Sequence, residues 1–257
     1  MNIKTFTPNR FLKSYIKEYR ILESETQREN RILPNSSIVL TFRIRGDVRI
    51  EERSKENGIP VLGIAGLRKS ARLIRYSEKA SMLLVNFQEG GAARFFKIPM
   101  NEIFGVNLSL DQLLPKSKTS ELEEKLSETK SDEEKIRIVE KFLLSIFRES
   151  NEDLLVMDSI QKIRNSKGNL RIQDLLKGMP ISRDSYEKRF RQTIGTSPKQ
   201  FANLIRITNL IERYSPIGSL TDAALEAGYF DQAHFIRDFR SFSGQTPKDF
   251  FKTPPLW

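Results

Sequence analysis

The first hydrophobic pattern along the chain lies near its N-terminus. Aromatic and aliphatic residues recur at helical spacing in the stretch that contains Phe11, Leu12, Tyr15, Ile16 and Tyr19. Residues spaced in this way share one face of a helix. The pattern predicts a short amphipathic helix, and Pro8 limits how early that helix can begin.

From Ser37 onward the pattern changes to alternation. Ile38, Leu40, Phe42 and Ile44 alternate with other residues, as in a strand with one buried face, and Gly46 lies in a turn before residues 48–50. Further runs at 61–64, 71–76 and 81–87 predict more strands, which together favour an antiparallel sheet or a small barrel. An Ala- and Phe-rich stretch from residue 90 predicts a helix that stops near Pro99.

The second half of the chain follows helical periods. After a Lys-, Ser- and Glu-rich stretch at 111–131, an apolar stripe over 136–147 predicts a helix, and another follows from residue 154. The fold class expected is therefore α+β. We divide the chain into a β-rich domain at 1–115, a helical linker at 116–150 and an all-α region at 151–257. The stripe over 136–147 can serve dimerisation or pack within its own domain.

The stretch from Ser219 to Phe250 predicts two helices that meet at a tight turn. Leu220 and Ala224 fall on one face of the first helix, and Gly228 suits the left-handed residue that ends it. Asp231 is a good N-cap for the second helix, whose apolar stripe contains Phe235 and Phe239. Two helices joined in this way form a helix-turn-helix, and its second helix can enter the DNA major groove.

The same pattern occurs earlier in the chain. The positions of Phe239-Arg240, Gly244, Pro247-Lys248 and Phe250 are occupied 49 residues earlier by Phe190-Arg191, Gly195, Pro198-Lys199 and Phe201. Chance agreement is improbable because capping, core and turn residues recur together. Between the copies, Pro198 to Tyr214 predicts one straight helix. Such a helix would span about 25 Å and could hold two recognition helices for successive major grooves, which are ~34 Å apart.

The second copy resembles the signature of AraC/XylS (AraC-type) transcription regulators. The matching run extends from Ala224 through Ala227-Gly228-Tyr229, His234-Phe235 and Arg237 to Thr246-Pro247. The resemblance implies two tandem helix-turn-helix units that bind double-stranded DNA, an N-terminal sensor domain, often a cupin-like barrel, and helices that often dimerise. It also implies RNA polymerase as a partner of an activator, and a small-molecule effector or a homodimer. The stretches that weakly resemble the sensor domain are ILPNSSIVLTF and FQEGGAARFFKIP.

The repeated unit provides two sets of candidate DNA contacts. Arg reads guanine bidentately, Gln reads adenine, and acidic side chains can accept from cytosine. On the recognition helices the candidates are Arg183, Asp184, Glu187, Lys188, Gln232, His234, Arg237 and Arg240. At the corners that follow, helix N-termini and basic side chains suit phosphate, and the candidates there are Ser197, Lys199, Thr246 and Lys248. Because Asp184 and Glu187 oppose phosphate, the first unit is expected to bind less tightly.

Composition narrows the function classes. The net charge of +10 is compatible with nucleic acid, and no apolar run approaches a membrane span, so no membrane partner and a cytoplasmic location are expected. The chain has no cysteine, and its one histidine is His234, which speaks against thiol catalysis and a histidine-held metal. We therefore expect no enzyme, no cofactor and no metal. The ligand-binding residues cannot be assigned, although Phe42, Tyr76, Phe87 and Phe95 could line a pocket or simply fill the core.

Two alternatives remain open at this stage. An N-terminal enzyme fused to a DNA-binding tail is disfavoured by the missing cysteines and histidines, although carboxylate chemistry would survive that test. Alternatively, the N-terminal domain only oligomerises, which a small or very polar pocket would favour. The effector, the operator, the choice between activation and repression and the oligomeric state do not follow from the sequence.

Overall fold

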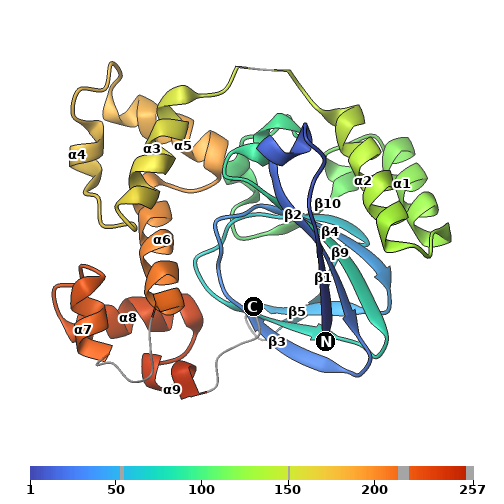
Figure 1. The fold of residues 1–257 in the computed structure, drawn as a ribbon, viewed down its shortest axis with the longest axis horizontal. Coiled ribbons are helices and arrows are strands. Elements are labelled where there is room, and N and C mark those ends of the chain that lie inside the picture. Colours follow the sequence, from blue (N-terminus) through green and yellow to red (C-terminus); the bar gives the residue numbers. More distant parts are fainter. Residues whose placement is uncertain (53–54, 150, 214–219, 253–257) are drawn as a thin grey trace.

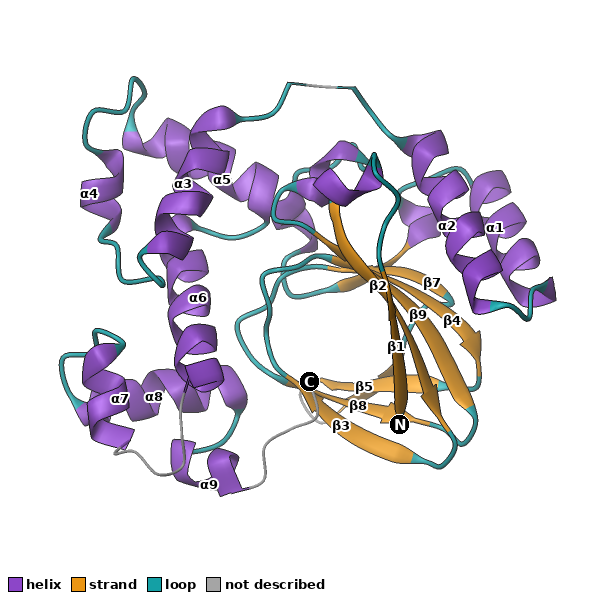
Figure 2. Cartoon of the chain, in the orientation of Figure 1, coloured by secondary structure: helices purple, strands orange, loops and turns teal. Residues whose placement is uncertain are grey.

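The computed structural model describes residues 1–257 except 53–54, 150, 214–219 and 253–257. Two parts are visible in Figure 1: a β-rich N-terminal part with two packed helices beside it, and a helical C-terminal part. All the strands of the described residues lie between residues 2 and 109, and Figure 2 shows them gathered in the N-terminal part. The expected α+β class, with a β-rich part followed by a helical part, is confirmed.

The N-terminal part contains two antiparallel sheets. The six-stranded sheet has the order β1-β2-β9-β4-β7-β10, and the four-stranded sheet has the order β3-β8-β5-β6. The strands are β1 Asn2–Phe6, β2 Ile16–Ser24, β3 Arg28–Ile32, β4 Val39–Arg45, β5 Val48–Glu52, β6 Lys55–Gly58, β7 Leu62–Ala65, β8 Arg72–Tyr76, β9 Ala80–Phe87 and β10 Asn107–Ser109. The predicted strands at 38–44, 48–50, 61–64, 71–76 and 81–87 correspond to β4, β5, β7, β8 and β9. The strands β1, β3, β6 and β10 were not predicted, and β2 begins in a stretch that was predicted to be helical.

The helix predicted over residues 11–19 is wrong. Only Leu12–Ser14 form a 3₁₀ turn, η1, and β2 begins at Ile16. A β-bulge between Ile16 and Glu18 shifts the register of β2 against β9. The extra residue places Ile16 and Tyr19 on the same buried face although they are three apart, which mimics the spacing of a helix.

The helix predicted from residue 90 to Pro99 is also wrong. This stretch contains a short 3₁₀ helix, η2 (Gly91–Arg94), and a second, η3 (Met100–Ile103), follows Pro99. A Cβ on Gly91 would lie 2.2 Å from the carbonyl oxygen of Tyr15, so the chain runs directly against its neighbour here. Packing of this backbone, and of the buried Phe95 and Phe96, outweighs local helix propensity. A further 3₁₀ turn, η4 (Leu110–Gln112), follows β10.

The rest of the described chain is helical. The predicted helix over 136–147 is α2, Asp132–Ile146, and the polar stretch before it forms an additional helix, α1, Lys116–Glu128. The apolar stripe of α2, including Val139 and Leu143, is buried within the same chain, which favours the alternative of packing in its own domain. The other helices are α3 Leu154–Asn165, α4 Ile172–Leu176, α5 Arg183–Ile194, α6 Pro198–Arg213, α7 Leu220–Glu226, α8 Gln232–Ser243 and α9 Pro247–Lys252.

The hydrophobic core does not follow the predicted domain limits. Alternate residues of β9 point to opposite sides: Leu83 and Val85 join the largest cluster, and Met82 joins a small cluster between the sheets. The largest cluster continues without a break from these strands and α1–α2 into α3, α5 and the first half of α6. A separate cluster holds α7, α8, α9 and the second half of α6, together with Leu33 from the N-terminal part.

Candidate nucleic-acid interface

The first helix-turn-helix consists of α4 and α5. Ser182 is the N-cap of α5, as predicted, and its side-chain oxygen accepts a hydrogen bond from the Ser185 N–H at 3.3 Å. Gly195 ends the helix with φ +96°, a conformation that glycine adopts without steric cost. Tyr186 and Phe190 are completely buried, so one face of α5 is fixed against α3 and α6, and the opposite face points outward.

The second helix-turn-helix consists of α7 and α8 and repeats these devices. Asp231 is the N-cap of α8 and accepts a hydrogen bond from the His234 N–H at 2.7 Å. The turn residue Gly228 has φ +77°, as the sequence predicted, and a Cβ there would lie 2.7 Å from Oδ1 of Asn169. Phe235 and Phe239 are completely buried. The two recognition helices are therefore held in corresponding ways.

One helix connects the two units. The 16 residues of α6 span about 24 Å, and α5 and α8 lie near its opposite ends in Figure 1. The predicted last residue of this helix, Tyr214, lies outside the described residues. A Cβ on Gly168 would lie 2.3 Å from the carbonyl oxygen of Ala202, so the turn after α3 is packed directly against α6. The connecting helix is thus braced and spaces the two units as a rod.

The outward face of α8 is positively charged. The exposed residues on this face are Gln232, Arg237 and Arg240. The neighbouring carboxylate of Asp238 pairs with Arg206 and His234. Phe230, in the turn before α8, is 91% exposed, which is unusual for a large apolar side chain. Phe230 has no distinguishing position in the sequence pattern, and only the fold reveals that its side chain lies outside the core.

The outward face of α5 is occupied by ion pairs within the helix. Glu187 accepts from Arg183 at 3.0 Å and pairs with Arg191 at 3.2 Å. The hydrogen bond from Arg183 holds the pKa of the Glu187 carboxyl below its usual value, and Arg191 adds to this effect. Asp184 and Lys188 are exposed. The Glu187 carboxylate is therefore shared by Arg183 and Arg191, two cations that could contact DNA.

His234 lies in a structural cluster at the buried edge of α8. Its Nε2 lies 3.5 Å from Asp238, and its ring packs edge-on against Tyr229 with 5.3 Å between centroids. The guanidinium of Arg206 on α6 lies over the Tyr229 ring, 4.1 Å from its centroid, and reaches Asp238 at 3.4 Å. Burial raises the pKa of Tyr229 to about 12, so its phenol is neutral at physiological pH. This cluster joins α6 to α8, and sequence patterns gave no sign of Arg206 or Asp238 in that role.

The corners after the recognition helices are capped as predicted. Ser197 Oγ accepts from the Gln200 N–H at 3.2 Å, and Thr246 Oγ1 accepts from the Asp249 N–H at 3.3 Å. Ser197 is 9% exposed, so its hydroxyl is used for capping and is nearly shielded from solvent. Lys199 and Lys248 are fully available on the surface. The corners thus place one free lysine beside each of two helix starts.

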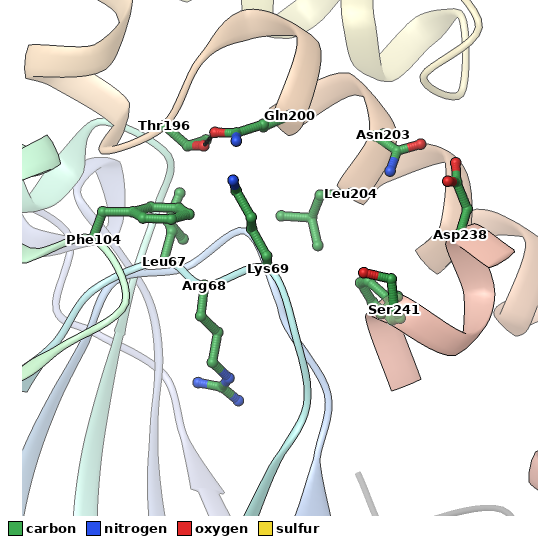
Figure 3. A pocket seen from close by; sticks show the side chains of 11 residues that line it. Leu67, Arg68, Lys69, Phe104, Thr196, Gln200, Asn203, Leu204, Asp238 and Ser241 are labelled. Carbon is green, nitrogen blue, oxygen red and sulfur yellow. Dashed lines mark hydrogen bonds between the residues drawn. The ribbon is translucent and has the colours of Figure 1, made fainter. Parts of the chain in front are cut away.

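A cavity lies between the N-terminal part, α6 with the corner before it, and α8. Its volume is about 170 Å³, below the ~300–1,000 Å³ of sites for drug-sized ligands. In Figure 3 the side chain of Lys69 extends across it toward Gln200, and Asp238 closes the far side. The aromatics considered for a pocket, Phe42, Tyr76, Phe87 and Phe95, are instead at most 4% exposed and fill the core. The cavity lining is Leu67, Arg68, Lys69, Phe104, Thr196, Gln200, Asn203, Leu204, Asp238, Ser241 and Phe242.

The described residues offer few other kinds of site. No three or more His, Cys, Asp or Glu side chains among them come together as metal ligands would. Within the same residues, none of the helices combines the length and the apolar character needed to cross a membrane. The duplicated helical units are therefore the most distinctive candidate site.

Comparison with known proteins bears on each half of the chain. Residues 175–253 match a family model described as a helix-turn-helix domain, and residues 4–109 match a domain of unknown function (DUF6597). The Msm operon regulatory protein of Streptococcus mutans serotype c (strain ATCC 700610 / UA159) is 28% identical over 121 residues. That match covers 45% of this chain and 43% of the relative, so the chain spans less than half of that protein's length.

Solved structures with a similar arrangement are distant in sequence. A structure of ToxT from Vibrio cholerae is 13% identical, with a TM-score of 0.49, and the match covers 91% of this chain and 97% of that one. ToxT from Vibrio cholerae strain SCE256, in a structure with unsaturated fatty acid bound, is 14% identical, with a TM-score of 0.46 and coverage of 90% and 93%.

The chain is a helix-turn-helix protein, because its C-terminal part contains two such units with capped, outward-facing recognition helices and matches that domain model. The signature on the second unit resembles that of AraC-type transcription regulators. The matches to a helix-turn-helix domain model and to an operon regulatory protein agree with this resemblance.

Proposed function

We propose that the protein is a sequence-specific regulator of transcription that binds double-stranded DNA through both helix-turn-helix units. The observation that carries this proposal is the repetition of one capped recognition helix at the two ends of a single rod, α6. A rod of about 24 Å suits two helices that enter successive major grooves on one side of the duplex. One chain would then read an asymmetric pair of half-sites.

We assign the stronger contacts to the second unit. Arg237 and Gln232 are exposed on α8 and have the side chains that read guanine and adenine. Arg240 lies on the same outward face, and Phe230 is placed to contact a thymine methyl group or a sugar. His234, which is turned toward Asp238, would contribute mainly by holding α8 in place.

The first unit is proposed to bind more weakly. Lys188 is the exposed basic residue at the position that corresponds to Arg237, but Asp184 is exposed near it. Arg183 is held by Glu187 within α5, so reaching a base would require that ion pair to open. Lys199 and Lys248 would neutralise phosphates at the two corners, where Ser197 and Thr246 cap the following helices.

The N-terminal part is proposed to control DNA binding by responding to an effector or a partner, and an activator would also contact RNA polymerase. Such a protein works in the cytoplasm, where the DNA is. No residue is assigned a catalytic role. A second candidate, in which the N-terminal part serves only to oligomerise, is favoured by the small volume of the cavity between the two parts. Sedimentation that shows a monomer both with and without DNA would rule out this second candidate, because that candidate requires an oligomer.

The proposal is tested by two substitutions after binding sites have been selected from random DNA. Arg237→Ala should relax the preference at particular base pairs, at about 1–3 kcal/mol if Arg237 reads a base. Lys199→Ala should weaken binding to all sequences alike and reduce the salt slope by about one. Lys141→Ala, on the exposed side of α2, removes the same charge far from both units and is the matched control. Equal behaviour of all three variants would contradict the contact assignments.

A further inference from the structure

The outward face of the first recognition helix is exposed to solvent, but a segment of the N-terminal part lies beside it. Met100–Ile103, the 3₁₀ helix η3 of the N-terminal part, lies across from it. Pro99, Asn101 and Glu102 form one wall of a groove whose other wall is the outward face of α5. That second wall consists of Asp184, Glu187, Lys188, Arg191 and Gln192, which include the residues proposed to read DNA.

The end of α5 is in direct contact with the same segment. A Cβ on Gly195 would lie 3.1 Å from the carbonyl oxygen of Met100, whose own side chain is completely buried. A Cβ on Gly90 would lie 3.3 Å from Thr193 and 3.4 Å from Met157. The two glycines therefore allow the N-terminal part to sit tightly against the C-terminal end of α5, and Figure 1 shows this end directed at the N-terminal part.

A polar contact also joins the N-terminal part to the first helices of the C-terminal part. Arg164 of α3 forms an ion pair with Glu89 and donates to Ser36 Oγ at 3.1 Å. Ser36 donates in turn to Glu89 at 2.6 Å. The Glu89 side chain is only 14% exposed, and Arg164 is 41% exposed. Glu89 is therefore the shielded partner, and the contact can open only if water or Ser36 replaces Arg164 at its carboxylate.

The second recognition helix is held differently. The Ala71 N–H donates to the carbonyl of Phe242 at 2.8 Å, and Arg31 reaches the carbonyl of Ser243 at 3.4 Å. Both contacts are at the C-terminal end of α8. Among the described residues, no hydrogen bond or ion pair joins the N-terminal part to the exposed Arg237 or Arg240. The N-terminal part thus forms a groove along the reading face of α5 and leaves the reading face of α8 clear.

We infer that the structure represents an autoinhibited state, in which η3 blocks the first helix-turn-helix from the DNA major groove and leaves the second able to bind. The inference rests on the proposed function. A helix with its side chains is about 10–12 Å wide, and the major groove is about 12 Å wide. A helix in that groove leaves no room for a second protein segment over its outward face. Binding through both units therefore requires η3 to move away from α5.

This arrangement gives the N-terminal part a defined means of control. A signal that separates η3 from α5 increases the population of chains that can use both half-sites, and a signal that favours the contact does the opposite. The second unit would bind one half-site in either state. The contact at η3 therefore sets the length of DNA that the protein occupies as well as its affinity.

The first test fixes the contact in place. The chain has no cysteine, so Asn101→Cys combined with Gln192→Cys introduces the only two thiols, one on each wall of the groove. The full-length variant is joined with a short bis-maleimide whose spacer contains a disulfide, and is then footprinted on a duplex with two selected half-sites. We expect protection of one half-site to disappear and affinity to fall on the order of tenfold or more, because one unit's contacts are lost. Reduction of the spacer should restore both, and the two single-cysteine variants, treated identically, are the controls.

The second test weakens the contact. Glu89→Ala removes the partner of Arg164 and should raise the affinity for the two-half-site duplex by several-fold, with little change for a single half-site. Glu78→Ala, in the exposed turn before β9, removes the same charge without an ion-pair partner in the C-terminal part and corrects for the general effect of charge on DNA binding.

The outcomes separate the two ideas. If the cross-linked protein still protects both half-sites, or if Glu89→Ala and Glu78→Ala change affinity equally, the autoinhibition is wrong while the proposed function stands. If no form of the protein binds DNA, before or after the spacer is cleaved, the proposed function itself is wrong. Loss of one half-site on cross-linking, recovered on reduction, supports both.

Discussion

Ser182 and Asp231 begin the two recognition helices by the same chemistry. Each side chain accepts a hydrogen bond from a backbone N–H three residues on, which satisfies one of the donors that a helix leaves unpaired at its start. The aspartate adds a negative charge at the positive end of the helix dipole. The second helix therefore depends more on its cap than the first helix does.

Replacement of Asp231 by Ala should destabilise the second unit by about 1 kcal/mol, because the cap and its charge are both lost. Faster hydrogen exchange of the first amides of α8 would report this change. Glu226→Ala, on the exposed side of α7, removes an equal charge without a cap and should leave those amides protected. Unchanged exchange in Asp231→Ala would mean that packing alone fixes the start of α8.

Tyr76 makes the N-terminal part sensitive to alkaline pH. Burial raises the pKa of its phenol to about 12, whereas the unfolded chain loses this proton near pH 10. The stability that it contributes is fully present below pH 10 and is lost as the pH rises toward 12. The free energy of unfolding of the unsubstituted protein should fall as the pH rises, and Tyr76→Phe should remove up to about 2–3 kcal/mol of this decrease. Urea unfolding between pH 8 and pH 11.5 measures it. If the free energy of unfolding depends on pH in the same way in both proteins, the buried phenol of Tyr76 is not the source of the alkaline sensitivity.

At the scale of elements, sequence periodicity predicted the strands and helices that have one regular buried face. The strands β4 and β9 and the helices α2, α3, α5, α6 and α8 all follow this rule. The predictions failed where tertiary contacts set the spacing. The bulge after Ile16 gave a strand the spacing of a helix, and the close approach at Gly91 broke a helix-like run into 3₁₀ turns.

The candidate site was predictable to a similar degree. Capping residues, core aromatics and outward polar residues of each unit follow from positions within the repeat, so Ser182, Tyr186 and Phe235 take the places expected of them. Long-range partners do not follow from a local pattern. The placement of η3 over α5 and the link from Arg206 to Asp238 join segments that only the fold brings together.

The separate core of the second unit predicts a local response to damage. Phe239→Ala removes a completely buried ring from the cluster that holds α7, α8 and α9, at a cost of about 3–5 kcal/mol. We expect this cost to unfold the second unit alone, seen as loss of hydrogen-exchange protection in α7–α9. Phe190→Ala, the matched change in the first unit, lies in the shared core and should instead lower protection in β9 and α5 together.

At the scale of the whole molecule, the protein divides by core rather than by the boundary near residue 150. One core cluster joins the six-stranded sheet to α1–α3, α5 and half of α6, and another holds the second unit. During a urea titration, protection of α3 and α5 should therefore disappear with that of β4 and β9, and protection of α8 should disappear at lower urea. Loss of α5 and α8 together, ahead of the sheet, would contradict this division.

The close fit of Gly90 against Met157 and Thr193 has a practical side. Anyone who expresses only residues 151–257, to obtain a minimal fragment for crystallisation or screening, strips the cover from Met157 and from Ile194, which is only 2% exposed in the intact chain. The fragment would then expose a hydrophobic patch at these residues, and exposed patches of this kind promote aggregation. A polar replacement at Met157, or retention of the natural cover, would be the first remedy for a preparation that precipitates.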